Sequence, residues 1–144
     1  MTGNPDLLLL ARPAAECPLR PGLESVRVSR GFTRATLGGW GLAGLSDQAE
    51  LVVSELVTNA IRHGVLSARR ALEEYPVGLR LLAQVPFVTC MVTDPGGQMP
   101  VLGPAGTDAE CGRGLHVVAA CSLRWGWRPL EAGGKVVWAL LREG

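Results

Sequence analysis

The sequence lacks the features that are typical of proteins that bind nucleic acid, associate with a membrane or are secreted. Its 14 Lys and Arg residues against 13 Asp and Glu residues give a formal net charge of +1, and neither sign forms a run. This balance leaves no basic footprint for nucleic acid or for an anionic lipid surface. The longest early apolar stretch, Leu7 to Ala11, follows Asp6 and is too short for a signal peptide or a membrane span. We therefore expect a cytoplasmic protein that binds neither nucleic acid nor membrane.

The four cysteines show no spacing that would hold a metal ion or mark a disulfide framework. No C-x-x-C pair or Cys/His ligand pattern includes Cys17, Cys90, Cys111 or Cys121, and no extracellular context argues for pairing them. We expect buried or partly buried thiols and no structural metal. With 144 residues, of which 47% are hydrophobic, the chain is long enough for one domain with a sizeable core.

The spacing of apolar residues predicts the order helix, helix, hairpin, long loop, helix, hairpin. This order fits an α+β fold, a two-layer sandwich in which three helices cover a mostly antiparallel sheet. A doubly wound sheet would need strands that alternate with helices. The expected helices cover residues 23–40, 47–64 and 114–120, and the expected strands cover residues 77–83, 87–94, 123–128 and 135–141.

Two segments lack such periodicity. Residues 1–22 contain four of the ten prolines and are expected to form an extended arm, with one short strand over residues 7–11. The domain would then cover residues 23–144. Residues 95–111 are too long, and too rich in glycine and proline, for a simple connector, so we expect a functional lid or a disordered insertion there.

The second predicted helix carries a polar stripe within an apolar run, "SELVTNAIRH". At about 100° per residue, Glu55 and Asn59 project about 40° apart and His63 about another 40° on, while apolar side chains gather opposite. A solvated face explains any one of these residues taken alone. Together they present a carboxylate, an amide and an imidazole from one rigid support.

Two further segments join glycine to the end of a predicted element. In "VTDPGG", Asp94 ends an apolar strand and shares a face with its apolar residues, although Asp before glycine is also common turn chemistry. In "CGRGLHVV", Gly112 and Gly114 open a helix, where free backbone N–H groups attract phosphate. Each signal is weak alone, because a G-x-G is a frequent way to enter a helix.

Four segments, taken in this order, resemble the N box and the three glycine boxes of the gyrase, heat-shock chaperone, histidine kinase and MutL ATPase superfamily: "ELVTNAIRHG", "VTDPGG", "GRGLHVVAACSLRWGW" and "GGKVVWALL". More closely, "SELVTNA", "RGLHVV", "RWGW" and "GGKVVWAL" are similar to stand-alone bacterial anti-sigma-factor serine/threonine kinases and related ATP-binding regulatory proteins. The resemblance covers about residues 22–142. It implies the Bergerat ATP-binding fold for residues 23–144, a histidine-kinase-like ATPase domain with a flexible ATP lid.

The resemblance also implies roles for the polar stripe. Asn59 stands at the N-box asparagine, which ligates Mg²⁺ through its side-chain oxygen. Glu55 stands at the catalytic glutamate one helical turn earlier, where a carboxylate accepts a proton from a substrate hydroxyl or from water. His63 is expected either near the phosphates or in structural packing.

The glycine boxes imply a site for the base and the phosphates of ATP. Asp94 matches the aspartate that accepts a hydrogen bond from the adenine amino group, which favours ATP over GTP because guanine presents a carbonyl oxygen there. Gly96 would permit close approach of the base. Gly112 and Gly114 match the box whose backbone amides meet the phosphates, and Arg113 between them would add positive charge.

The sequence departs from the family pattern in the first and last glycine boxes. Gln98 stands where the first box commonly has glycine, so this loop is expected to be less pliable. Val136 stands where relatives often have threonine after the lysine, whose hydroxyl reaches adenine through water. Valine lacks that hydroxyl, so we expect modest affinity for ATP.

The resemblance leaves two functions of different class. One is an enzyme, a serine/threonine protein kinase that phosphorylates an anti-sigma antagonist with ATP and Mg²⁺. The other is a non-catalytic binding module that sequesters a sigma factor or another partner, with nucleotide as a structural ligand. The presence of both Glu55 and Asn59 favours the kinase, because sequestration does not need a base. The resemblance further implies a homodimer, formed through the surface of the first helix and the sheet edge.

Overall fold

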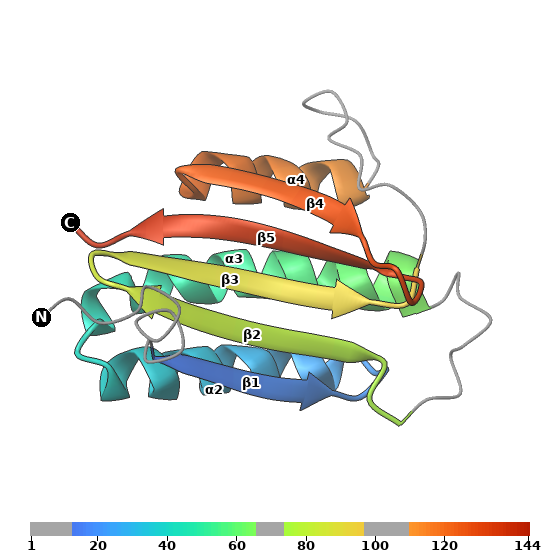
Figure 1. Cartoon of the computed structure of the whole chain (residues 1–144), viewed down its shortest axis with the longest axis horizontal. Helices are drawn as coiled ribbons and strands as arrows, with labels where there is room; N and C mark the ends of the chain where they lie inside the picture. The colour runs from blue at the N-terminus through green and yellow to red at the C-terminus, as the bar shows by residue number, and fades with distance from the viewer. Residues whose placement is uncertain (1–12, 66–73, 97–109) are drawn as a thin grey trace, which may run out of the picture.

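The computed structural model describes residues 13–65, 74–96 and 110–144 of the chain (Figure 1). Within these residues the helices and hairpins follow the predicted order, preceded by one additional strand. The strands are β1 (Ala14–Leu19), β2 (Val77–Gln84), β3 (Phe87–Asp94), β4 (Arg124–Pro129) and β5 (Lys135–Arg142). The helices are α2 (Glu24–Gly39), η1 (Ala43–Leu45), α3 (Ser46–Asn59), η2 (Ala60–Val65) and α4 (Glu110–Cys121).

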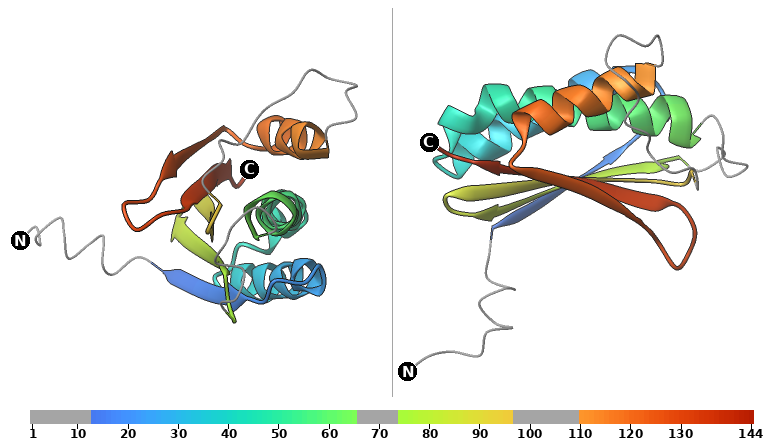
Figure 2. Two further views of the ribbon diagram at one scale, coloured as in Figure 1. Left: turned by 90° about the vertical axis from the view of Figure 1, so that its right-hand side faces the viewer. Right: turned by 90° about the horizontal axis from the view of Figure 1, so that it is seen from above.

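The described residues form two layers. The strands make one sheet in the order β1-β2-β3-β5-β4, and every neighbouring pair is antiparallel. Helices α2, α3 and α4 lie together against one face of this sheet (Figure 2). The predicted α+β sandwich is therefore confirmed.

Strand β1 lies inside the segment for which the sequence predicts an extended arm. It pairs with β2 along its whole length, from Ala14 opposite Leu82 to Leu19 opposite Val77. The sequence did not predict this strand because Pro13 and Pro18 argue against a central strand. Proline is tolerated at the edge of a sheet, which is where β1 lies. The strand predicted over residues 7–11 lies outside the described residues.

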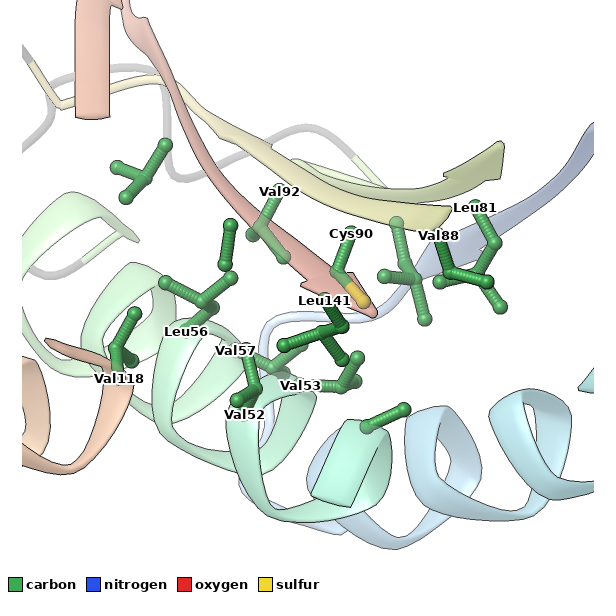
Figure 3. Packing of buried hydrophobic residues seen from close by; sticks show 14 of the residues in the cluster. Val52, Val53, Leu56, Val57, Leu81, Val88, Cys90, Val92, Val118 and Leu141 are labelled. Atoms are coloured by element: carbon green, nitrogen blue, oxygen red, sulfur yellow. The ribbon is translucent and has the colours of Figure 1, made fainter. Parts of the chain in front are cut away.

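The core lies between the sheet and the helices. The alternation predicted for β3 is confirmed, since Val88, Cys90, Val92 and Asp94 are all buried. Figure 3 shows Val88, Cys90 and Val92 directed toward apolar residues of α3, and Leu81 and Leu141 join them from the neighbouring strands. The opposite face of the sheet is not covered by the described helices (Figure 2).

Helix α2 buries a stripe of small hydroxyl residues beside the apolar positions expected from the sequence, of which Val26, Phe32 and Trp40 also pack against the core. Its buried residues are Ser25, Ser29, Thr33 and Leu37, a stripe with a four-residue repeat. Ser29 Oγ donates to the Val26 carbonyl at 2.7 Å and Thr33 Oγ1 donates to the Ser29 carbonyl at 2.8 Å. The helix thus satisfies the hydroxyl groups of Ser29 and Thr33 itself, while Ser25 Oγ donates to the Arg20 carbonyl ahead of the helix at 2.7 Å. The small side chains allow α2 to contact α3 closely.

The helix predicted over residues 47–64 changes its winding before it ends. The α-helical part stops at Asn59, and residues 60–65 continue as a π-helix. Because a π-helix closes i to i+5 hydrogen bonds, His63 does not keep the 40° offset from Asn59 that an α-helix would give it. Glu55 and Asn59 lie on the α-helical part of the polar stripe, and His63 follows four residues later in the π-helical turn.

Helix α4 begins at Glu110, four residues before its predicted start. The segment predicted as an ATP lid, including Gln98, falls mainly on residues 97–109, which lie outside the described residues. No helix of the described segments is both long and apolar enough to cross a membrane.

Candidate functional site

Asp94 is the centre of a buried polar cluster at the end of β3. Its side chain is 2% exposed, and its Oδ1 accepts a hydrogen bond from the Gly96 amide at 2.8 Å. Lys135 Nζ lies 3.0 Å from the same oxygen and also donates to the Gly96 carbonyl at 3.2 Å. One carboxylate oxygen of β3 therefore contacts both the turn after β3, through Gly96, and the first residue of β5, Lys135.

Three glycines allow the backbone to approach this cluster. A β-carbon at Gly64 would lie 2.4 Å from Asp94 Oδ1, and one at Gly96 would lie 2.6 Å from the Gly64 Cα. Gly134 has φ +80° and a β-carbon there would lie 2.3 Å from the Asp94 carbonyl oxygen. Side chains at these positions would displace the carboxylate or the chain around it, so the glycines determine where Asp94 lies.

Burial dominates the electrostatics of Asp94. Loss of water raises the pKa of the Asp94 carboxyl above its ordinary value, while the Lys135 cation and the Gly96 amide act to lower it. A buried carboxylate needs hydrogen-bond donors to remain charged. The lysine and the amide supply them, and a ligand that offers a further N–H donor would add to them.

The second part of the site follows the side of α3 that borders α4. Gln48 Nε2 donates to the backbone carbonyl of Cys121, which joins the start of α3 to the end of α4. Glu55 and Asn59 follow seven and eleven positions after Gln48, so helical geometry places all three on one stripe of α3. Glu55 and Asn59 are both half-buried. The carboxylate and the amide therefore lie along the border between α3 and α4.

The two parts of the site lie at one end of the molecule. Helices α3 and α4 run antiparallel, because the start of α3 contacts the end of α4. Figure 1 shows the end of α3 with η2, the end of β3, and the start of α4 at the same end of the sheet. The positive end of the α4 dipole is directed to that end, as an anionic ligand requires.

The residues predicted to bind the phosphates of ATP lie within α4 rather than before its first residue. Gly112 and Arg113 fall among the first four residues of the helix, whose N–H groups lack an intrahelical acceptor, and Gly114 is the fifth. The structure describes only the backbone of these three residues. His63 lies in η2, is half-buried, and neighbours Gly64 of the Asp94 cluster. The structure therefore brings Asp94, Gly96 and η2 together and places Glu55 and Asn59 on the adjoining helix.

Val136 lies on the other face of the sheet from Asp94, while the modest ATP affinity expected from the sequence stays a prediction. Val136 pairs with Thr93 on the face of the sheet opposite the helices, and the two residues line a groove of about 550 Å³ there. Lys135 pairs with Asp94 on the helix-covered face instead. Because side chains alternate along a strand, a hydroxyl at position 136 would be directed away from Asp94. The residue of the last glycine box that reaches this site is Lys135.

A comparison with known protein families finds a match that covers most of the chain. The family profile described as the histidine kinase-like ATPase domain matches residues 19–140. The chain belongs to this family. None of the curated proteins matches the chain.

As a histidine kinase-like ATPase domain, the chain is an ATP-binding protein of regulatory type. The residues at the site fit such a ligand, since a buried acceptor, glycines with close backbone approach and the start of a helix lie at one end of the fold. Among the described residues, no cluster of three His, Cys, Asp or Glu side chains could hold a metal ion by itself. Mg²⁺ beside a nucleotide is commonly held by phosphate oxygens, water and one or two protein oxygens, and the Asn59 side chain could supply one such oxygen.

Sequence reasoning did not single out two residues of the cluster. It assigned Gly64 only to the end of a helix, and it gave Lys135 no role. Lys135 is the sole lysine among the 14 basic residues of the chain, and this unusual count was the available signal. Gly64 offered no comparable signal, because glycine after a helix is common for reasons of backbone conformation alone.

Proposed function

We propose that this chain is an ATP-dependent serine/threonine protein kinase that phosphorylates an anti-sigma antagonist protein. Phosphoryl transfer to a hydroxyl requires a positioned nucleotide, positive charge at the phosphates and a base near the acceptor. The observation that carries the proposal is the spacing of Glu55 and Asn59, one α-helical turn apart on the stripe of α3 that borders α4. A purely structural stripe needs neither an acidic nor an amide side chain at half-buried positions.

Each of these residues would have a separate task. Asn59 would hold Mg²⁺ through a neutral oxygen, which leaves the charge of the ion for the phosphates. Bound Mg²⁺ supplies the positive charge that offsets the negative phosphoryl oxygens. Glu55 would accept the proton of the serine or threonine hydroxyl while the hydroxyl oxygen bonds to the γ-phosphorus of ATP. The bond from that phosphorus to the β,γ-bridging oxygen would break at the same time and release ADP.

The remaining residues would bind and orient ATP. Asp94 would accept the hydrogen bond of the adenine amino group. The backbone amides of Gly112 and Arg113 would meet the phosphates at the positive end of α4. Rigid support from α3, α4 and β3 holds these groups before the substrate arrives, which is the main contribution a protein makes to phosphoryl transfer.

The alternative function is a non-catalytic module that holds a sigma factor and keeps nucleotide as a structural ligand. In that case Glu55 would have no chemical task, and its replacement would leave partner binding unchanged. The kinase and the module therefore differ in what the Glu55 carboxylate does, and one substitution separates them.

The test is Glu55→Gln, which keeps the length of the side chain and removes the basic oxygen. Transfer of labelled γ-phosphate to a partner purified with the chain would be measured together with ATP affinity. We expect transfer to fall by about 100-fold or more, and affinity to change by no more than about threefold. Asp47→Asn serves as the matched control, because Asp47 is an exposed acid in the first turn of the same helix.

Two results would overturn the proposal. One is a Glu55→Gln protein that transfers phosphate as fast as the parent. The other is a parent chain that binds ATP and its partner but transfers no phosphate with any divalent cation at any concentration tested. That result would favour the sequestration module.

A further inference from the structure

Lys135 is an unusual residue in this chain. It is the sole lysine, since the other 13 basic residues are arginine, and it is 6% exposed. Lysine is almost never so deeply buried unless it is paired, because the ammonium group is strongly hydrated in water. The pairing of Lys135 with Asp94 joins two residues that are 41 positions apart and both in the core.

The contacts of this pair are unevenly divided between the two carboxylate oxygens. Among the described residues, two donors contact the Asp94 carboxylate, the Gly96 amide at 2.8 Å and Lys135 Nζ at 3.0 Å, and both meet Oδ1. Gly64 also packs against Oδ1, since a β-carbon there would lie 2.4 Å from it. Oδ1 is thus enclosed by three parts of the protein. Within the described residues, Oδ2 receives neither of these two hydrogen bonds, which leaves it as the candidate acceptor for a ligand.

A structural role alone is a weak reason for such a pair. Two buried charges lose their hydration, and an apolar pair of similar volume commonly gives equal or greater stability. A lysine that holds an aspartate in one orientation and in its charged form has a clearer purpose where that aspartate must accept a hydrogen bond. An ammonium group has three donors, and Asp94 and Gly96 receive two of them from Lys135.

We infer that Lys135 is a positioning residue for base recognition: it holds Asp94 by Oδ1, so that Oδ2 is presented as an ionised acceptor to the amino group of adenine. The inference rests on the ATP-binding part of the proposed function and does not depend on phosphoryl transfer. It assigns to Lys135 the inward-directed position of the last glycine box, while Val136 lies on the other face of the sheet.

Guanine would be rejected at this arrangement. Its carbonyl oxygen would face the Oδ2 acceptor without a hydrogen bond between them, and the carboxylate would be left buried and partly unsatisfied. If Lys135 were absent, Asp94 could rotate or take up a proton, and a protonated carboxyl can donate to the guanine oxygen. Removal of Lys135 should therefore lower ATP affinity and also reduce the preference for adenine.

The first experiment compares ATP and GTP binding by calorimetry in Lys135→Met, Lys135→Arg and the parent. We expect Lys135→Met to reduce the ratio of ATP to GTP affinity by about tenfold or more, and Lys135→Arg to recover part of it because the charge remains. Arg124→Met is the matched control, an exposed cation of β4 on the same sheet. It should leave the ratio unchanged.

The second experiment uses the unaltered protein, so that its result does not depend on whether a variant folds. Because the chain has one lysine, labelling with lysine carrying ¹³C at Cε gives a single NMR signal that reports on Lys135. We expect saturating ADP to shift this signal, and GDP at the same concentration to shift it much less. Circular dichroism of Lys135→Met and of the double variant D94N/K135M would show whether loss of the charge pair alters folding.

Three outcomes would overturn the inference. One is an unchanged ratio of ATP to GTP affinity in a folded Lys135→Met, which would make Lys135 purely structural. Another is tighter ATP binding by Lys135→Met, which would show that the ammonium group competes with adenine for Asp94. The third is an NMR signal that ADP does not move. A chain that binds ATP with the expected preference but transfers no phosphate would overturn the kinase alone.

Discussion

Gly64 and Asp94 are in such close contact that no side chain fits between them, since a β-carbon on Gly64 would lie 2.4 Å from Asp94 Oδ1. Gly64 belongs to the π-helical turn after α3, and Asp94 ends β3. The contact therefore connects the helix that carries Glu55 and Asn59 to the strand that carries the buried carboxylate. A displacement of either element would therefore displace the other, because the interior between them is closely packed.

Gly64→Ala is expected to displace Asp94 and weaken the cluster around it. The added methyl group should lower the free energy of unfolding by about 1–3 kcal/mol, as overpacking in a core does, and should reduce ATP affinity. Thermal denaturation and calorimetry measure the two effects. Gly31→Ala is the control: nothing lies within 4 Å of its added β-carbon in α2, and the greater helix propensity of alanine should stabilise the protein by about 0.5–1 kcal/mol. Unchanged ATP affinity in Gly64→Ala would contradict the proposed link between Asp94 and the base.

Asn59→Ala is expected to weaken ATP binding mainly when Mg²⁺ is present. The lost oxygen would contact the ion and not the base, so affinity should fall by about tenfold or more in Mg²⁺ but by less than about threefold in EDTA. Calorimetry in the two buffers measures this difference. Thr58→Ala, the neighbouring half-buried polar position of α3, is the control. An equal loss of affinity in both buffers would exclude Asn59 as a metal ligand.

Glu50→Gln is expected to loosen the contact between α2 and α3. The Glu50 carboxylate is buried, accepts from Ser46 Oγ at 3.1 Å, and lies 3.0 Å from Arg34 Nε and 4.0 Å from Arg30 Nε. Because both arginines are largely exposed and screened by solvent, loss of the negative charge should lower the free energy of unfolding by only about 1 kcal/mol. Urea denaturation compared with Glu131→Gln, at an exposed turn, checks this. Equal stability of the two variants would mean that solvent screens the Glu50 pair completely.

Cys90 is expected to resist alkylation as long as the protein is folded. Burial raises the pKa of its thiol to about 12, and the side chain is fully enclosed by the core. At pH 8 only about one thiol in ten thousand would then carry the reactive charge. Mass spectrometry after iodoacetamide treatment, with and without denaturant, measures the reaction site by site. The half-buried Cys17 of the edge strand is the comparison, and rapid labelling of Cys90 in the native protein would contradict its burial.

Much of the fold follows from short-range patterns that the sequence carries by itself. The two hairpins and α2 begin and end within about two residues of their predicted bounds, because alternation and helical repeats act over a few residues. Asp94 was predicted to share the buried face of β3 for the same reason, and Glu55 and Asn59 were predicted to share a stripe of their helix. The winding of residues 60–65 as a π-helix was not predictable in this way, since it arises where the chain packs against β3.

Only the tertiary structure decided which residues meet across the fold. Alternation tells which face of β5 a residue takes, but the register of β3 against β5 is what sets Lys135 beside Asp94 and Val136 beside Thr93. Strand β1 likewise exists because β2 offers an unpaired edge, despite the prolines in its sequence. The sequence by itself determined the order of the helices and hairpins and the chemical groups of the site. Long-range pairing determined the enclosure of one carboxylate oxygen by Gly64, Gly96 and Lys135, because contacts between residues far apart in the chain depend on the whole packed core.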